Sequence, residues 1–436
     1  MDKITTEEIR DLVILIIEAK DFLELKHDND GNIRKNIYLL NDIKDAVEVV
    51  LNTITQDKSS YFFALTQRLI QKLEIVFSED DDFRILVKLC DEWIEMATFE
   101  IAEKYYSEKN YNKAAHEYDK LISASSNELK AISFHRLGQV YSSTNPMEAY
   151  HYYKESFRVN DQVVKYFVAS DHPSYHYVYG EVDESYQEVC HFCGIESKPY
   201  FCAESYRGLS FNKIYSPVKV WMRCESCDHI FSLNNPTSLR QLKYEGVNFR
   251  MMPPKYAFLP TIGEILIRLQ QYSKGQKLLD VGIGGGELLA VAKELQFDVE
   301  GLEIVELQAK HVSTILNIEV HACDFLEYMT NKRYNLITLG DVIEHIEDPV
   351  KTIQKAYELL DDQGVFWIST PNYNSAFASF VKFEDAMWKE AGHLHYFSYT
   401  SLRMVLENNG FEVIGYNLSK NYKGSMEVTA LKKTRS

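Results

Sequence analysis

Apolar positions recur at helical spacing through roughly the first 160 residues, without glycine-rich hairpin turns. This pattern predicts a helical domain over residues 1–165. From about residue 168 to 235 the segments are short, rich in aromatic residues and punctuated by Pro and Gly, which predicts a small module of strands over residues 166–245. After Pro253 and Pro254 a helix is expected to reach Tyr272, and short apolar strands then alternate with helices. Residues 246–436 are therefore predicted to form an α/β domain within a multidomain α + α/β protein.

One pair of helices in the helical domain resembles a tetratricopeptide repeat. Its first helix carries Phe134, Leu137, Gly138 and Tyr141 in the order of that repeat, and a weaker copy precedes it, so that the resemblance covers residues 98–160. Fewer than three repeats do not bury a core by themselves, so residues 1–95 are expected to complete the bundle. The domain is then either a plain helical scaffold or a groove for a protein partner.

Length and charge exclude some classes of protein. A chain of 436 residues predicts roughly two to four folding units, and its 45% hydrophobic and 25% charged residues are typical of a globular protein. The net charge of −17 argues against a duplex nucleic-acid partner, because phosphates bind basic surfaces. No apolar run approaches the roughly 20 residues of a membrane span, and the first residues lack the features of a signal peptide. We therefore expect a cytoplasmic protein without a membrane span.

Two Cys-x-x-Cys pairs predict a metal site in the module of residues 166–245. The pairs are Cys190 with Cys193 and Cys224 with Cys227. Two residues between thiolates allow a tight turn to direct both sulfurs at one ion, and two such turns complete a tetrahedral zinc site. Such a site has no open position, so the predicted Zn²⁺ is structural. The neighbouring His191 and His229 are expected to be bystanders.

A glycine-rich segment marks the start of the α/β domain. A buried strand is expected to end near Asp280 and to turn through Gly282, Gly284 and Gly286 into a helix. In a dinucleotide-binding fingerprint the third glycine would fall at position 287, where this chain has Glu, so NAD is disfavoured. The spacing instead resembles the first motif of the class I S-adenosylmethionine (SAM) dependent methyltransferases, which have a Rossmann-like seven-stranded sheet.

That resemblance implies further cofactor-binding residues. Glu303, at the tip of the second strand, would hold the ribose hydroxyls of SAM, and Asp324 and Phe325 would face the adenine. The fourth strand is followed by a segment similar to the Asp-x-x-Glu-His-x-x-Asp-Pro signature of the small-molecule and glycan branch of the family, which adds Asp341 to the cofactor site. The resemblance covers residues 278–431.

The chemistry requires an aligned acceptor and, for a hydroxyl or carbon acid, a base. The segment from Trp388 to Ser398 contains two histidines, and a histidine pKa suits proton transfer near neutral pH. His393 is the first candidate, because the segment resembles the catalytic-histidine loop of zinc-containing nucleotide-sugar C-methyltransferases. Gly392 replaces a Glu of that family, so O-methylation is weighed equally with C-methylation. Further candidates for the base are His395, His345 and Glu344.

Three functions follow from these patterns. The leading prediction is an enzyme that methylates a sugar, glycan or related small molecule. A second is a methyltransferase whose protein or carrier-bound acceptor is delivered by the tetratricopeptide-like region. A third is a non-catalytic, SAM-binding scaffold held together by zinc.

Overall fold

The computed structural model describes residues 83–208, 211–237 and 252–434, together with residues 13, 14, 16, 17, 44, 45, 47, 48, 68 and 69. The chain divides into two compact units, the first formed by Met1–Thr144 and Glu148–Phe167 and the second by Asn145–Met147 and Val168–Ser436. Most of the predicted helical segment before residue 83, and the predicted boundary at residues 245 and 246, lie outside the described residues. The division into three domains stays a prediction.

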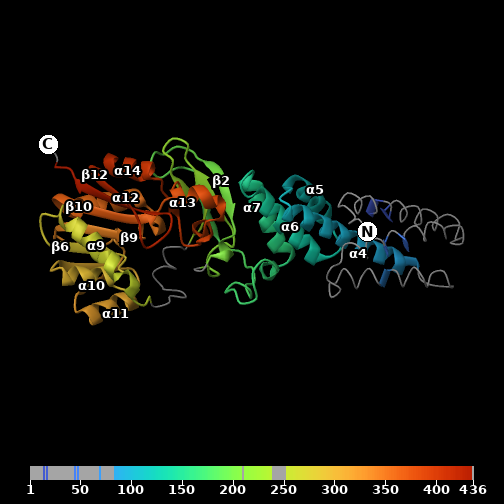
Figure 1. Cartoon of the computed structure of the whole chain (residues 1–436), viewed down its shortest axis with the longest axis horizontal. Coiled ribbons are helices and arrows are strands. Elements are labelled where there is room, and N and C mark those ends of the chain that lie inside the picture. The colour runs from blue at the N-terminus through green and yellow to red at the C-terminus, as the bar shows by residue number, and fades with distance from the viewer. Residues whose placement is uncertain are drawn as a thin grey trace. The chain divides into compact units, whose positions relative to one another are not determined.

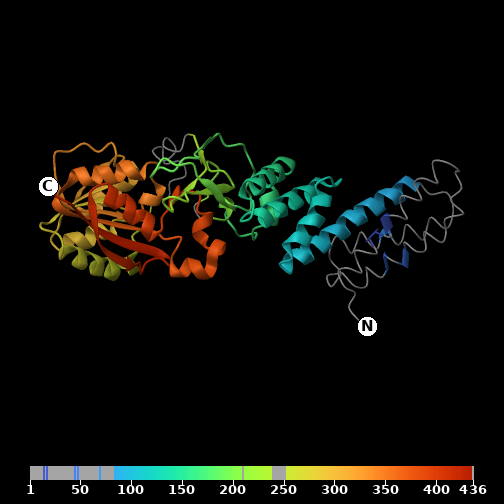
Figure 2. The same ribbon diagram turned by 90° about the horizontal axis from the view of Figure 1, so that it is seen from above.

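The described part of the first unit is helical, as predicted. Its helices are α4 (Phe83–Ser107), α5 (Tyr111–Leu121), α6 (Asn127–Tyr141) and α7 (Pro146–Val159), followed by the short η2 (Val163–Tyr166). Figure 2 shows α4 as a long helix that leads into the shorter ones. Large aromatic side chains fill the centre of this unit, and Trp93 and Tyr118 are completely buried.

Small residues let these helices approach one another closely. A Cβ atom on Gly138 of α6 would lie 2.9 Å from ring atoms of Tyr153 on α7, and Ala102, Ala114 and Ala149 are fully buried. The resemblance of these helices to a tetratricopeptide repeat stays a prediction. Whether these helices bind a partner remains a prediction.

The second unit is built on a seven-stranded mixed sheet, which confirms the predicted Rossmann-like domain. The strand order is β12-β13-β10-β9-β6-β7-β8, and β13 runs antiparallel to both of its neighbours. The strands are β6 (Lys277–Val281), β7 (Asp298–Glu303), β8 (Glu319–Ala322), β9 (Tyr334–Gly340), β10 (Leu360–Pro371), β12 (Phe411–Leu418) and β13 (Ser425–Lys432). Chain order reverses between β6 and β9, and ligands bind at such switch points in open α/β sheets.

Helices cover both faces of the sheet (Figure 1). One face packs against α9 (Leu259–Gln270), α10 (Glu287–Glu294) and α11 (Glu306–Leu316), in a core that includes Leu266 and Leu289. The other face packs against α12 (Pro349–Leu359) and α14 (Tyr399–Asn408), around Ile353 and Leu402. The central strands are therefore apolar on both faces, as parallel strands between two helix layers must be.

A smaller antiparallel sheet in the same unit joins two distant parts of the chain. Its order is β11-β4-β3-β2, with β2 (Lys198–Ala203), β3 (Lys219–Arg223), β4 (Ile230–Ser232) and β11 (His395–Tyr396). A further pair joins β1 (Glu184–Tyr186) to β5 (Asn234–Pro236). We call residues 184–237 the cysteine module, because they hold both Cys-x-x-Cys pairs. Strand β11 comes from the segment that carries His393, so the module pairs directly with the predicted catalytic segment.

Three short helices complete this segment of the second unit: α13 (Ala376–Val381), η6 (Lys382–Glu384) and η7 (Ala386–Lys389). They precede β11 and connect it to the end of β10.

Among the residues that the structure describes, no helix has the length and apolar character needed to cross a membrane.

Candidate functional site

The predicted cofactor residues converge at the carboxyl ends of β6, β7, β8 and β9. Two cavities open there, of about 470 and 150 Å³, and Gly282 lines both. Neighbouring parallel strands end at the same edge of the sheet, which explains why residues far apart in the sequence meet. The edge therefore offers two adjoining chambers for one elongated ligand.

The glycine turn after β6 requires residues without a Cβ atom. Gly282, Gly284 and Gly286 have φ angles of 74°, 55° and 90°, in the left-handed region. A Cβ atom on Gly282 would also lie 2.5 Å from Cγ2 of Val342, whereas one on Gly284 would meet nothing within 4 Å. Gly286 is the N-cap of α10, so the turn presents backbone N–H groups at a helix N-terminus.

The larger cavity contains the residues predicted to bind adenosine. Glu303, Asp324 and Phe325 all line it. Glu303 is largely buried, and its Oε1 accepts a hydrogen bond of 3.0 Å from the backbone N–H of Val305. Burial raises the pKa of the Glu303 carboxyl. A buried carboxylate beside an apolar wall suits a ligand that carries both hydroxyl groups and an aromatic ring.

The smaller cavity contains the other two predicted acids, Asp280 and Asp341. Asp280 is almost fully buried and accepts a 2.7 Å hydrogen bond from Oγ1 of Thr338, while burial raises its pKa to about 7. Asp341 accepts a 2.9 Å hydrogen bond from Ser369, and burial raises its pKa as well. Glu287 also lines this chamber, and three acids favour a cationic group in the ligand.

Several residues of the smaller cavity were not predicted. Lys255, Trp367, Asn421 and Tyr422 also line it. Nε1 of Trp367 and Oδ1 of Asn421 are buried and have no hydrogen-bond partner in the part of the chain that the structure describes. One orphaned donor and one orphaned acceptor beside a cavity fit a polar ligand such as the zwitterionic end of SAM. None of these four residues belongs to a motif, so no local signal in the sequence could have identified them.

Glu344, His345 and His393 form one compact group, and His345 is the member of this group that lines the larger cavity. Their ligand atoms all lie within 4.8 Å of one another, so the group could also hold a metal ion. The rings of the two histidines meet edge-on, with 4.5 Å between their centroids. Buried Glu344 accepts a 3.0 Å hydrogen bond from Thr370, and burial raises its pKa well above the usual range.

Hydrogen bonds define which nitrogen of each ring carries a proton. Nδ1 of His345 donates to the carbonyl oxygen of Gly392 at 3.0 Å. Nδ1 of His393 lies 2.8 Å from the hydroxyl of Tyr396, which donates its own hydrogen to the carbonyl oxygen of Met387. The hydroxyl oxygen must therefore accept from His393, so a neutral His393 has its lone pair on Nε2. Burial, with smaller contributions from His345 and Lys219, holds the pKa of His393 well below its usual range.

The structure does not bring His395 into this group. Its side chain is buried, and its Nδ1 lies 3.2 Å from Nε2 of His229. His191 packs edge-on against His395, with 5.0 Å between the ring centroids. Nδ1 of His229 in turn lies 3.5 Å from the sulfur of Cys190. His395 therefore belongs to a histidine cluster next to the cysteines, and the two predicted bystanders lie in the same cluster.

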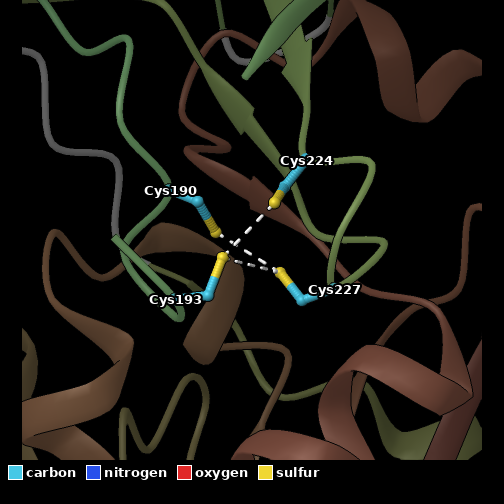
Figure 3. A group of neighbouring side chains, drawn as sticks. All are labelled: Cys190, Cys193, Cys224 and Cys227. Carbon is cyan, nitrogen blue, oxygen red and sulfur yellow. Dashed lines mark hydrogen bonds between the residues drawn. The ribbon is translucent and has the colours of Figure 1, made fainter. Parts of the chain in front are cut away.

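The four predicted metal ligands converge on one point (Figure 3). The sulfur of Cys190 lies 3.4 Å from that of Cys227, and the sulfur of Cys193 lies 3.4 Å from that of Cys224 and 3.8 Å from that of Cys227. A tetrahedral ion with Zn–S bonds of about 2.3 Å has sulfur–sulfur edges of about 3.8 Å. The residues present therefore fit a four-cysteine zinc site.

Part of the second unit is similar to a known protein family. Residues 257–415 match the family model of a methyltransferase domain. This part of the chain is therefore similar to a methyltransferase domain. The match begins just before α9 and ends within β12, so it includes the Glu344–His345–His393 group and the lining of the larger cavity. Lys255, Asn421 and Tyr422 of the smaller cavity lie outside it.

Curated relatives of the methyltransferase domain are named ubiquinone biosynthesis O-methyltransferase. The protein from Histophilus somni is 33% identical over 118 residues, which cover 24% of this chain and 50% of that protein. The protein from a Shewanella species is 32% identical over 112 residues, which cover 23% of this chain and 45% of that protein. The chain thus spans about half the length of the curated relatives it matches. Their names identify a reaction of those proteins.

Solved structures resemble the methyltransferase domain at low sequence identity. The CcbJ methyltransferase from Streptomyces caelestis is 13% identical with a TM-score of 0.34, and covers 42% of this chain and 91% of its own. A second structure is the magnesium protoporphyrin IX methyltransferase from Synechocystis, determined with bound S-adenosylhomocysteine (SAH). It is 16% identical with a TM-score of 0.34, and the match covers 41% of this chain and 83% of that protein.

Proposed function

We propose that this protein transfers a methyl group from SAM to a hydroxyl group, or to an acidic carbon, of a sugar, glycan or related small molecule. SAM supplies the activated methyl group when it is bound. The protein then has to bind both reactants, align the acceptor and remove its proton. The names of the matched relatives contain O-methyl transfer, which favours a hydroxyl acceptor.

The observation that carries this proposal is the pairing of His345 with His393 beside the larger cavity. The hydrogen bond from Nδ1 of His393 to Tyr396 leaves Nε2 as the basic nitrogen, and the low pKa keeps this ring neutral near pH 7. A neutral imidazole with a fixed tautomer can accept the acceptor's proton as the methyl group is transferred. We propose His393 as the general base and Glu344 and His345 as groups that orient it or contact the acceptor.

We further propose how the chain holds SAM. Glu303 would accept hydrogen bonds from the ribose hydroxyls, and Asp324 and Phe325 would bind the adenine in the larger cavity. The zwitterionic end would occupy the smaller cavity, where Asp280 and Asp341 favour positive charge.

A structural Zn²⁺ would be held by the four cysteines of the module, Cys190, Cys193, Cys224 and Cys227, in keeping with their sulfur–sulfur distances. A cytoplasmic location agrees with reduced cysteines.

Two alternatives remain from the sequence. An acceptor on a protein or carrier would require binding to the tetratricopeptide-like helices, and substitutions on the exposed surface of these helices would then lower activity only toward that acceptor. A non-catalytic scaffold would bind SAM without forming SAH. The smaller cavity contains buried polar atoms without a partner among the described residues, on Trp367 and Asn421. Such atoms favour a site that still binds its complete ligand over one that has lost this ability.

The decisive experiment is an SAH-formation assay with SAM and a panel of nucleotide sugars, free sugars and catechols. Transfer by the wild type, together with a roughly 10²–10⁴-fold loss in His393→Gln, is expected. SAM affinity, measured by calorimetry, should remain unchanged in this variant. His311→Gln is the matched control, because this histidine is exposed on α11. Full activity of His393→Gln would exclude it as the base, and SAM binding without transfer to any acceptor would favour the scaffold.

A further inference from the structure

We propose that Lys219 of the cysteine module is a positioning residue that fixes the turn bearing His393, so that the module forms one wall of the active site. The inference rests on the proposed role of His393 as the base. Lys219 is the first residue of β3, the strand that leads to Cys224. It therefore connects a predicted metal ligand to the predicted catalytic segment through one short strand.

The contacts of Lys219 point to this role. Only 3% of this residue is exposed, which is unusual for a lysine. Its Nζ donates hydrogen bonds to the carbonyl oxygens of Ala391 and His393, at 2.6 and 2.7 Å. The ring centroids of Trp221 and Tyr215 lie 5.3 and 6.0 Å from the same nitrogen. A buried ammonium group is costly unless its donors are satisfied, so these carbonyls are specific partners.

The turn is held from two sides. Lys219 binds the carbonyls of residues 391 and 393, and His345 donates to the carbonyl between them, that of Gly392. Three successive carbonyl oxygens are thus fixed alternately by the cysteine module and by the segment after β9. Because His345 holds the backbone of the turn that bears His393, and the two rings are in contact, this arrangement determines how the rings meet.

Backbone hydrogen bonds extend the same connection. The N–H of Leu394 donates to the carbonyl oxygen of Glu344 at 2.7 Å, and the carbonyl oxygen of Leu394 accepts from Ser232 of β4 at 2.9 Å. Nε1 of Trp221 donates to the carbonyl oxygen of Trp388 at 3.2 Å. The module therefore contacts the catalytic segment before, at and after His393, and Lys219 supplies the contact nearest to it.

The test compares Lys219→Met with Lys219→Arg in the full-length, zinc-loaded protein. The readouts are hydrogen exchange of the amides of residues 391–396 and the ¹⁵N shifts of the His393 imidazole, assigned by their loss in His393→Gln. In Lys219→Met we expect exchange at least about tenfold faster and loss of the single Nδ1–H tautomer. Lys219→Arg should restore both. SAM affinity should be unchanged throughout, because Lys219 lines neither cavity.

Lys198→Met is the matched control, since this lysine is exposed on β2 of the same module. If Lys219→Met does not fold, Lys219→Gln, which keeps a hydrogen-bond donor, takes its place in the same comparison. Native exchange and an unchanged tautomer in a folded variant without the ammonium group would overturn the proposal. Neither readout needs an acceptor, so a wild type that binds SAM but transfers no methyl group would refute the proposed function separately.

Discussion

Protonation of Asp280 should control SAM binding near neutral pH. Burial raises the pKa of this carboxyl to about 7, so about one tenth of it is ionised at pH 6 and about nine tenths at pH 8. SAM carries a net positive charge, and the ionised carboxylate binds it more favourably than the neutral acid. If only the ionised form binds, affinity is about tenfold weaker at pH 6 than at pH 8, which corresponds to ~1.4 kcal/mol.

Asp280→Asn tests this reasoning with little change in shape. The amide oxygen can still accept the hydrogen bond from Thr338. Calorimetric titration with SAM between pH 6 and 8 should show the tenfold change in the wild type, with protons released on binding near pH 7. The variant should bind more weakly at pH 8 and show a much smaller change with pH. Asp298→Asn is the control and should behave as the wild type, because Asp298 begins β7, at the end of the strand away from Glu303 and the two adjoining cavities.

The Asp280 carboxyl also makes the stability of the SAM-free protein depend on pH. Its pKa is higher in the folded chain than in the unfolded chain, where about 3.9 is expected. The folded state therefore binds more protons between about pH 4 and 7, so the free energy of unfolding falls as pH rises through this range. Asp280→Asn should remove this component from the pH dependence of Tm. Equal pH dependence of wild type and variant, in both binding and Tm, would refute the assignment.

Four further substitutions test the cofactor and metal sites. Glu303→Gln should weaken SAM binding by roughly 10- to 100-fold, as expected for lost charge-assisted hydrogen bonds, and calorimetry that finds no change would remove Glu303 from the site. Gly282→Ala should lower the free energy of unfolding by about 1–3 kcal/mol in denaturant titration, because it combines a left-handed φ with the contact to Val342. Gly284→Ala, with open space around its Cβ position, should cost less, and the reverse order would contradict the steric argument. Cys224→Ser should reduce bound zinc from one per chain and lower Tm, whereas unchanged metal content by mass spectrometry would argue against a four-cysteine site.

Local patterns predicted the Rossmann-like fold and which motif residues meet at one edge of its sheet, whereas their role in binding a cofactor stays a prediction. The order of strands and helices follows from apolar periodicity, and motif residues such as Asp280 and Glu303 meet because parallel strands end at one edge of a sheet. The four cysteines meet because each pair is local and each turn directs its two sulfurs to one side.

Other parts of the site depend on contacts between distant segments. Lys219, Lys255 and Trp367 carry no sequence signature, and their positions follow only from how the segments pack. The same limit explains His393 and His395, which lie two residues apart but in different surroundings. One packs against His345, the other against His229, because β11 begins only after the turn that contains His393. Periodicity does not show where a two-residue strand starts.

The pairing of β4 with β11 has a consequence for synthesis of the protein. The backbone N–H of Ser232 donates to Leu394, which is synthesised roughly 160 residues later. Ribosomes add about 5–20 residues per second. One edge of β4 therefore emerges roughly 8–30 s before its partner exists. During that interval the two cysteine pairs are already available to bind an ion. We expect metal capture on the nascent chain to hold the strand edge in place, which links cellular zinc supply to the yield of correctly folded protein.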